Sequence, residues 1–329
     1  MKPIILGSGI TACSFLYHFG KKFPGREVIN LDSQHLFPSV DKNIKVLVSE
    51  NGISRGVSSL GDLLLDSFEY FENEFSNFSG VQKVVQQHLC VPDFFDESKF
   101  VRRFLSSGTP LRYGPMTAPV FGVSSYCYLI NPNIFLPELR NRSRLNIETL
   151  GKTITNIEIE KKIELTDLDK HTLVTENLFC GAGPFSKLLP INFLDSCRQE
   201  RHKIVFGGAW GADVDFGSDS FVLTVNMANL IYDAEFKRVQ ITGKTVEDYN
   251  LIDSPGGLEE NHHLFNSIVE NLPAFSYGQI ISSLRNKGHK RQPYLYHCRK
   301  NSLEIVSISG AYKNGYTTAP FMAKSYFNL

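Results

Sequence analysis

A short glycine turn close to the first residue constrains this chain more than any other feature. Residues 3–6 are apolar, a Gly-Ser-Gly turn follows at residues 7–9, and residues 10–19 repeat apolar side chains at helical spacing. A polar loop, 21–26, leads to a second apolar run, 27–31. This pattern predicts a strand, a tight turn, a helix and a second strand, which together form a βαβ unit.

The turn has the G-x-G-x-x-A spacing of a dinucleotide-binding motif, in Gly7, Gly9 and Ala12. The first glycine permits the turn, the second lets a diphosphate approach the backbone, and the alanine allows close packing of helix and strand. The first helical N–H groups, at Ile10 and Thr11, would then bind the phosphates.

The second strand ends on an acidic residue, as the same motif requires. Asp32 lies 23 positions after Gly9 and is followed by Ser33. A carboxylate at this place binds a ribose hydroxyl of the dinucleotide. Turn, helix and acid together predict a dinucleotide site, whereas an ordinary turn beside a surface aspartate is the simpler alternative.

Composition excludes several classes of protein. The chain has 329 residues, of which 42% are hydrophobic and 21% charged, so it can form one large domain or two interlocked ones. Its 34 basic and 34 acidic residues balance, so charge gives no reason to expect a nucleic-acid partner. Six cysteines without a CxxC pair argue against a zinc module and a disulfide framework, and favour the cytoplasm. We expect no metal site, and no apolar run is long enough to predict a membrane span.

Two later segments are similar to turns of one enzyme superfamily. Residues 179–189 (FCGAGPFSKLL) resemble the second dinucleotide fingerprint of two-domain FAD oxidoreductases, in particular the D-amino-acid oxidase and glycine oxidase superfamily. Residues 309–320 (SGAYKNGYTTAP) resemble the turn that this superfamily places against the flavin ring, and are most similar to the glycine oxidase branch. The final helix is expected to begin at Ala319-Pro320.

The resemblance implies an α/β fold in which a Rossmann-like FAD-binding domain, of the two-dinucleotide-binding-domain type, is interleaved with an antiparallel-sheet substrate domain. The FAD-binding domain is then discontinuous, over residues 1–80, 126–192 and 284–329. The substrate domain takes residues 81–125 and 193–283.

The resemblance also implies non-covalently bound FAD and further residues that contact it. These are Arg55, Gly56, Ser59 and Gly61 in a loop over the flavin, Ile154 against adenine, Gly181, Ala182 and Gly183 in the second fingerprint, and Gly310, Asn314, Gly315, Tyr316 and Thr317 in the last turn.

Three residues are candidates for catalysis or substrate binding: Arg285, Tyr312 and Lys313. Arg285 lies where the superfamily carries the arginine that binds a substrate carboxylate through two parallel hydrogen bonds. Lys313 stands where the glycine oxidase turn has arginine, which weakens the expectation that glycine is the substrate.

The function implied is oxidation of a C–N bond in a small amine or amino acid, by hydride transfer from the α-carbon to flavin N5. Two alternatives stay open: an NAD(P)-dependent dehydrogenase, and a non-catalytic flavin-binding partner or assembly protein. A substrate carried on a peptide or a modified RNA base is also open. The sequence predicts neither the electron acceptor nor the oligomeric state.

Overall fold

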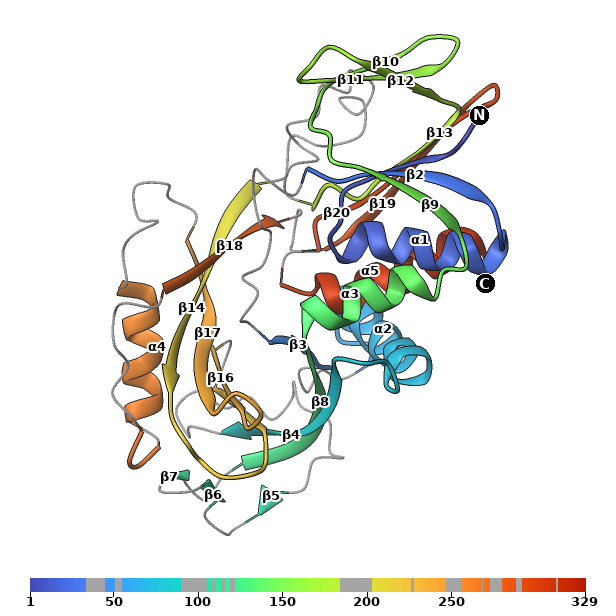
Figure 1. The fold of residues 1–329 in the computed structure, drawn as a ribbon. Coiled ribbons are helices and arrows are strands. Elements are labelled where there is room, and N and C mark those ends of the chain that lie inside the picture. Colours follow the sequence, from blue (N-terminus) through green and yellow to red (C-terminus); the bar gives the residue numbers. More distant parts are fainter. Residues whose placement is uncertain are drawn as a thin grey trace.

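The chain folds around two sheets that lie side by side (Figure 1). A computed structural model describes residues 1–33, 45–50, 55–89, 106–107, 111–113, 116–118, 122–183, 203–225, 228–246, 256–267, 269–272, 280–287, 292–311 and 313–329. No helix in these ranges is both long and apolar enough to cross a membrane.

The first sheet contains the predicted βαβ unit. Its strand order is β19-β20-β13-β1-β2-β9, and every neighbouring pair except β19 with β20 is parallel. The carboxyl ends of β20, β13, β1 and β2 therefore meet at one edge, where open α/β sheets bind ligands. The strands are β1 (Ile4–Leu6), β2 (Glu27–Leu31), β9 (Asn146–Leu150), β13 (Asn177–Cys180), β19 (Tyr294–Lys300) and β20 (Leu303–Ser309).

Helices cover one face of this sheet and a small antiparallel sheet covers the other (Figure 1). Ile5 of β1 packs with Phe15 on the helical side, whereas Ile4 packs with Leu165 of the small sheet, because successive strand residues point to opposite faces. The helices are α1 (Ile10–Lys22), α3 (Pro132–Asn141) and α5 (Gly315–Phe327), and the small sheet is β10 (Ile154–Ile159), β11 (Ile163–Asp167) and β12 (Thr172–Thr175).

The second sheet is long and mostly antiparallel, in the order β18-β14-β17-β16-β15-β4-β8-β3. One face packs Trp210, which is 2% exposed, against Phe265 of α4 (Gly256–Asn266). Its strands are β3 (Val46–Val48), β4 (Val81–Leu89), β8 (Gly122–Ile130), β14 (Lys203–Asp213), β15 (Phe221–Val225), β16 (Ala228–Asp233), β17 (Arg238–Val246) and β18 (Ile280–Lys287). Three short strands accompany it: β5 (Ser106–Ser107), which pairs with β8, and β6 (Leu111–Tyr113) with β7 (Met116–Ala118).

The remaining helix, α2 (Ser59–Phe75), connects the two parts through an aromatic cluster. Phe71 and Phe75 of α2 are fully buried with Phe135 of α3 and Tyr128 of β8. This packing holds the second sheet against the helical layer of the first.

The structure confirms the strands, turn and helix predicted at residues 3–31, and it confirms the predicted fold class. The predicted start of the last helix is wrong: α5 begins at Gly315, and Pro320 lies inside it. The Asn314 carbonyl already accepts hydrogen bonds from Thr317 and Thr318, so Pro320 removes only one later hydrogen bond from a helix already begun.

The predicted domain boundaries stay a prediction. Sheet membership shows how the chain crosses between the two parts: β3 and β8 belong to the second sheet, although the helix α2 between them packs toward the first. β18 also belongs to the second sheet and extends to Lys287.

Candidate functional site

Two of the three predicted glycine turns touch without side chains between them. Gly7 has φ +107°, and a Cβ added to it would lie 2.6 Å from the Gly181 carbonyl oxygen. A Cβ on Gly181 would in turn lie 2.6 Å from the backbone nitrogen of Ala12. The end of β1, the end of β13 and the start of α1 are therefore in backbone contact, which only glycine permits here.

The third turn reaches the same place. Gly310 has φ +73°, and a Cβ on Gly315 would lie 3.7 Å from Cγ2 of Ile10. Ala311 in this turn also forms an isolated antiparallel bridge with Lys287, the last residue of β18. The three turns therefore converge, and the third also contacts the second sheet.

Two helices begin at this convergence, and neither has a side-chain cap. Ser58 caps α2 and Asn131 caps α3, whereas α1 and α5 have no side-chain cap and no acidic residue in the first turn. In the described part of the chain, the first N–H groups of both helices have no hydrogen-bond partner: Ile10, Thr11 and Ala12 in α1, and Gly315 and Tyr316 in α5. Free N–H groups at a helix start bind anions.

Asp32 directly follows β2 beside the first turn and is 3% exposed. Its backbone N–H donates to the Leu150 carbonyl at 3.0 Å, but its Oδ2 atom is buried without a partner among the described residues. A buried carboxylate oxygen without a partner is costly, and a ribose hydroxyl would satisfy it.

Asn30 of β2, which was not among the predicted site residues, holds the Gly-Ser-Gly turn in place through its side chain. Its Nδ2 atom donates to the carbonyls of Ile5 at 3.0 Å and Gly7 at 2.7 Å. The signal in the sequence was a polar residue within an otherwise apolar buried strand, where a side chain must find a hydrogen-bond partner.

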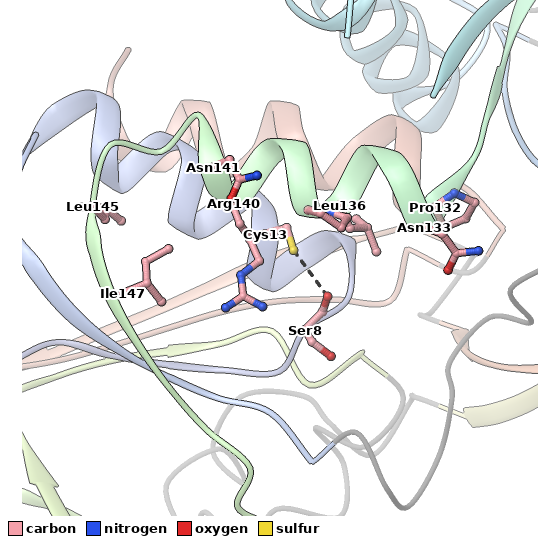
Figure 2. Close-up of a pocket in the computed structure, with 10 residues that line it drawn as sticks. Ser8, Cys13, Pro132, Asn133, Leu136, Arg140, Asn141, Leu145 and Ile147 are labelled. Carbon is pink, nitrogen blue, oxygen red and sulfur yellow. Dashed lines mark hydrogen bonds between the residues drawn. The ribbon is translucent and has the colours of Figure 1, made fainter. Parts of the chain in front are cut away.

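A cleft of about 650 Å³ opens beside the first turn, between α1, α3 and β9 (Figure 2). Ser8 and Cys13 line one side, and the lining from α3 and β9 includes Arg140 and Ile147. The Cys13 thiol donates to the Ser8 carbonyl at 3.4 Å. Burial raises the pKa of Cys13 to about 12, so the thiol is protonated at neutral pH and serves as a small apolar group.

Each of the four residues predicted in the loop over the flavin interacts with another residue of the chain. Arg55 pairs with Asp66 at 2.7 Å on an exposed surface. The N–H of Gly56 donates to Asp62 at 2.7 Å, and that of Gly61 donates to Ser58 at 3.0 Å. The Ser59 hydroxyl accepts from Gln292.

The other predicted cofactor residues lie near the edge of the first sheet. Ser33 follows Asp32 and is exposed, and Ile154 begins β10. Ala182 packs with the small sheet, and Gly183 has φ +56°. All cofactor contacts assigned to these residues stay predictions.

Of the three predicted catalytic residues, two lie within the described part of the chain. Arg285 belongs to β18, in register with Val205, and its strand ends at the bridge to Ala311. Lys313 donates from Nζ to the Gly243 carbonyl of β17 and so connects the last turn to the second sheet. Tyr312 lies outside the described residues.

The fold just described is similar to the folds of several oxidases and dehydrogenases of known structure. The glycine oxidase of Bacillus cereus superposes on the chain with a TM-score of 0.72 and 14% identity, covering 100% of this chain and 96% of the oxidase. L-proline dehydrogenase from P. horikoshii has a TM-score of 0.70 and 13% identity, covering 100% of this chain and 92% of the dehydrogenase. L-alpha-glycerophosphate oxidase from Mycoplasma pneumoniae, a structure with FAD bound, has a TM-score of 0.70 and 11% identity. The match covers 98% of this chain and 92% of the oxidase.

Sequence comparisons find no such likeness. No protein-family profile matches the chain, and no curated protein matches it by sequence. At identities this low, the structural likeness establishes the fold, and the residues at the edge must carry the functional argument.

Proposed function

We propose that this chain is an FAD-dependent oxidoreductase that oxidises a C–N bond in a small amine or amino acid. The convergence of the turns at Gly7, Gly181 and Gly315 carries the proposal. An NAD(P)-dependent dehydrogenase accounts only for the first of these turns, whereas FAD, whose three-ring flavin is much larger than nicotinamide, gives all three turns a ligand.

The residues at the edge fit a flavin dinucleotide in three ways. The uncapped start of α1 would bind the diphosphate through the N–H groups of Ile10 and Thr11. Asp32 has a buried oxygen free for the ribose. The uncapped start of α5 offers the N–H groups of Gly315 and Tyr316 to the ring end of the cofactor.

The flavin, when bound, supplies the chemistry by accepting a hydride equivalent from the substrate carbon. The free N–H groups of Gly315 and Tyr316 at the start of α5, together with the positive end of the helix dipole, would stabilise negative charge on a reduced ring. When the substrate amine arrives already deprotonated, its proton having gone to solvent, the chain needs no acidic or nucleophilic side chain for this step, and its task is to orient the substrate.

Arg285 is our candidate for binding a substrate carboxylate. It lies in β18 five residues after Ile280, which pairs with Trp210. The same strand ends beside the last turn, which places this arginine at the junction of the two sheets.

Lys313 would hold that junction together. Because its Nζ atom binds the Gly243 carbonyl, we assign it a positioning role between the last turn and β17. This assignment agrees with the poorer fit of a lysine to a carboxylate, which an arginine binds through two parallel hydrogen bonds.

A flavin-reduction screen tests the proposal. The FAD-loaded protein is mixed anaerobically with amino acids, the corresponding amines without a carboxylate, and glycerol phosphate, and bleaching of the flavin absorbance is measured. We expect amino acids to reduce the flavin, and Arg285→Met to raise the substrate concentration needed at least about tenfold. Arg299→Met, on the exposed edge strand β19, is the matched control.

Two other results of this screen would change the proposal. Reduction by glycerol phosphate alone would move the chain to C–O oxidation. FAD binding without reduction by any member of the panel would favour the non-catalytic flavin-binding alternative.

A further inference from the structure

The strongest unassigned feature is a cation on the wall of the cleft beside the first turn. Arg140 lies in the last turn of α3, and Figure 2 shows its side chain extending across the cleft toward Ser8. Ser8 is the central residue of the Gly-Ser-Gly turn, directly before the free N–H groups of α1. A positive side chain and a positive helix end thus face the same space.

The guanidinium of Arg140 is held in place but not neutralised. Its Nη2 atom donates to the Thr149 hydroxyl of β9 at 2.7 Å. Within the part of the chain that the structure describes, Arg140 forms no ion pair, whereas Arg142, one half-turn later, pairs with Glu138 at 2.6 Å. A half-buried arginine without a carboxylate partner leaves most of its donors for a ligand.

The surroundings favour an anion over water as that ligand. Three apolar side chains line the cleft: Leu136 of α3, Leu145, and Ile147 of β9. They weaken the solvent screening of the positive charge of Arg140. Asp32 is close enough for its charge, like that of Arg140, to act on the Cys13 thiol. Arg140 and Asp32, the carboxylate that we assign to the ribose, therefore both lie near Cys13 of α1.

We propose that Arg140 is a diphosphate ligand of the bound dinucleotide, approaching from the α3 side while the N–H groups of α1 approach from the helix end. The guanidinium plane suits two phosphate oxygens at once, and Thr149 fixes its orientation. This inference rests on the proposed function for the identity of the dinucleotide.

The test measures binding to the full-length apoprotein by flavin fluorescence quenching for FAD and by calorimetry for ADP and adenosine. Arg140→Met is expected to weaken FAD and ADP binding by about tenfold to a hundredfold and to leave adenosine binding unchanged. Arg140→Lys keeps the charge and should recover part of the loss. Added salt should weaken FAD binding to the wild type more than to Arg140→Met.

Arg142→Met is the matched control, because it removes a charge from the same helix end without facing the cleft. Thermal unfolding shows whether each variant is folded, and Thr149→Val tests the anchor alone, with a loss smaller than that of Arg140→Met.

The outcomes separate this inference from the proposed function. A wild type that binds no FAD would overturn the proposed function itself. A wild type that binds FAD, with folded Arg140→Met binding FAD and ADP equally well, would overturn the role of Arg140. Equal losses for ADP and adenosine would also overturn it, since they would show a general effect on the cleft.

Discussion

Replacing Gly181 by alanine should damage the site through one contact. The added methyl would lie 2.6, 2.7 and 2.8 Å from N, Cα and Cβ of Ala12. Ordinary contact distances between such atoms are about 3.5–4.0 Å, so the start of α1 would have to move by about 1 Å. Overpacking of this kind costs about 1–3 kcal/mol in the free energy of unfolding.

The same movement displaces the N–H groups of Ile10 and Thr11 from the diphosphate. We therefore expect Gly181→Ala to weaken FAD binding at least about tenfold, measured by fluorescence quenching, alongside a lower urea midpoint. Gly25→Ala is the control: Gly25 has φ +75° and no atom within 4 Å of an added Cβ, so it should lose about 1–2 kcal/mol of stability with unchanged affinity. Gly181→Ala with wild-type affinity would refute the reasoning.

Three further predictions follow from single residues. Asp32→Asn removes a buried carboxylate with an unpartnered oxygen, so the apoprotein should gain about 1 kcal/mol of stability while FAD affinity falls about tenfold; a loss of both would contradict this. Burial lowers the pKa of His18 from 6.5 to about 4. The unfolded chain therefore binds a proton at residue 18 that the folded chain does not, and between about pH 7 and about pH 5 His18→Gln should lose about 2 kcal/mol less stability to urea than the wild type. Burial lowers the pKa of His88 to about 4 as well, so the variant keeps part of the pH dependence. Lys45 pairs at 3.3 Å with Asp233, where both side chains are about nine-tenths buried, and also at 3.3 Å with the exposed Glu235, so Asp233→Leu combined with Glu235→Gln should cost about 3–5 kcal/mol; adding Lys45→Met should recover most of it, and no recovery would contradict the pairing.

The part of the site that the sequence predicts well is local. Gly7, Ala12 and Asp32 belong to one βαβ unit, in which strand, turn and helix follow directly along the chain. The contacts of such a unit depend on short-range spacing, so a pattern of residues fixes them. Gly181 and Gly315 were predicted from the resemblance of residues 179–189 and 309–320 to the turns of one superfamily, which is also a local pattern of residues.

What the sequence could not provide depends on contacts between distant segments. Arg140 reaches Thr149 only because α3 lies beside β9, and the bridge from Lys287 to Ala311 depends on the pairing of β18 within the second sheet. The start of α5 was misplaced because proline usually marks a helix start, whereas here the Asn314 carbonyl begins the helix earlier.

Titration of the folded apoprotein with FAD, beside NAD and NADP, tests the central claim most directly. The convergence of the three glycine turns predicts one FAD per chain, little or no binding of either nicotinamide dinucleotide, and competition by ADP. A folded protein that binds a nicotinamide dinucleotide tightly and takes up no FAD would contradict it.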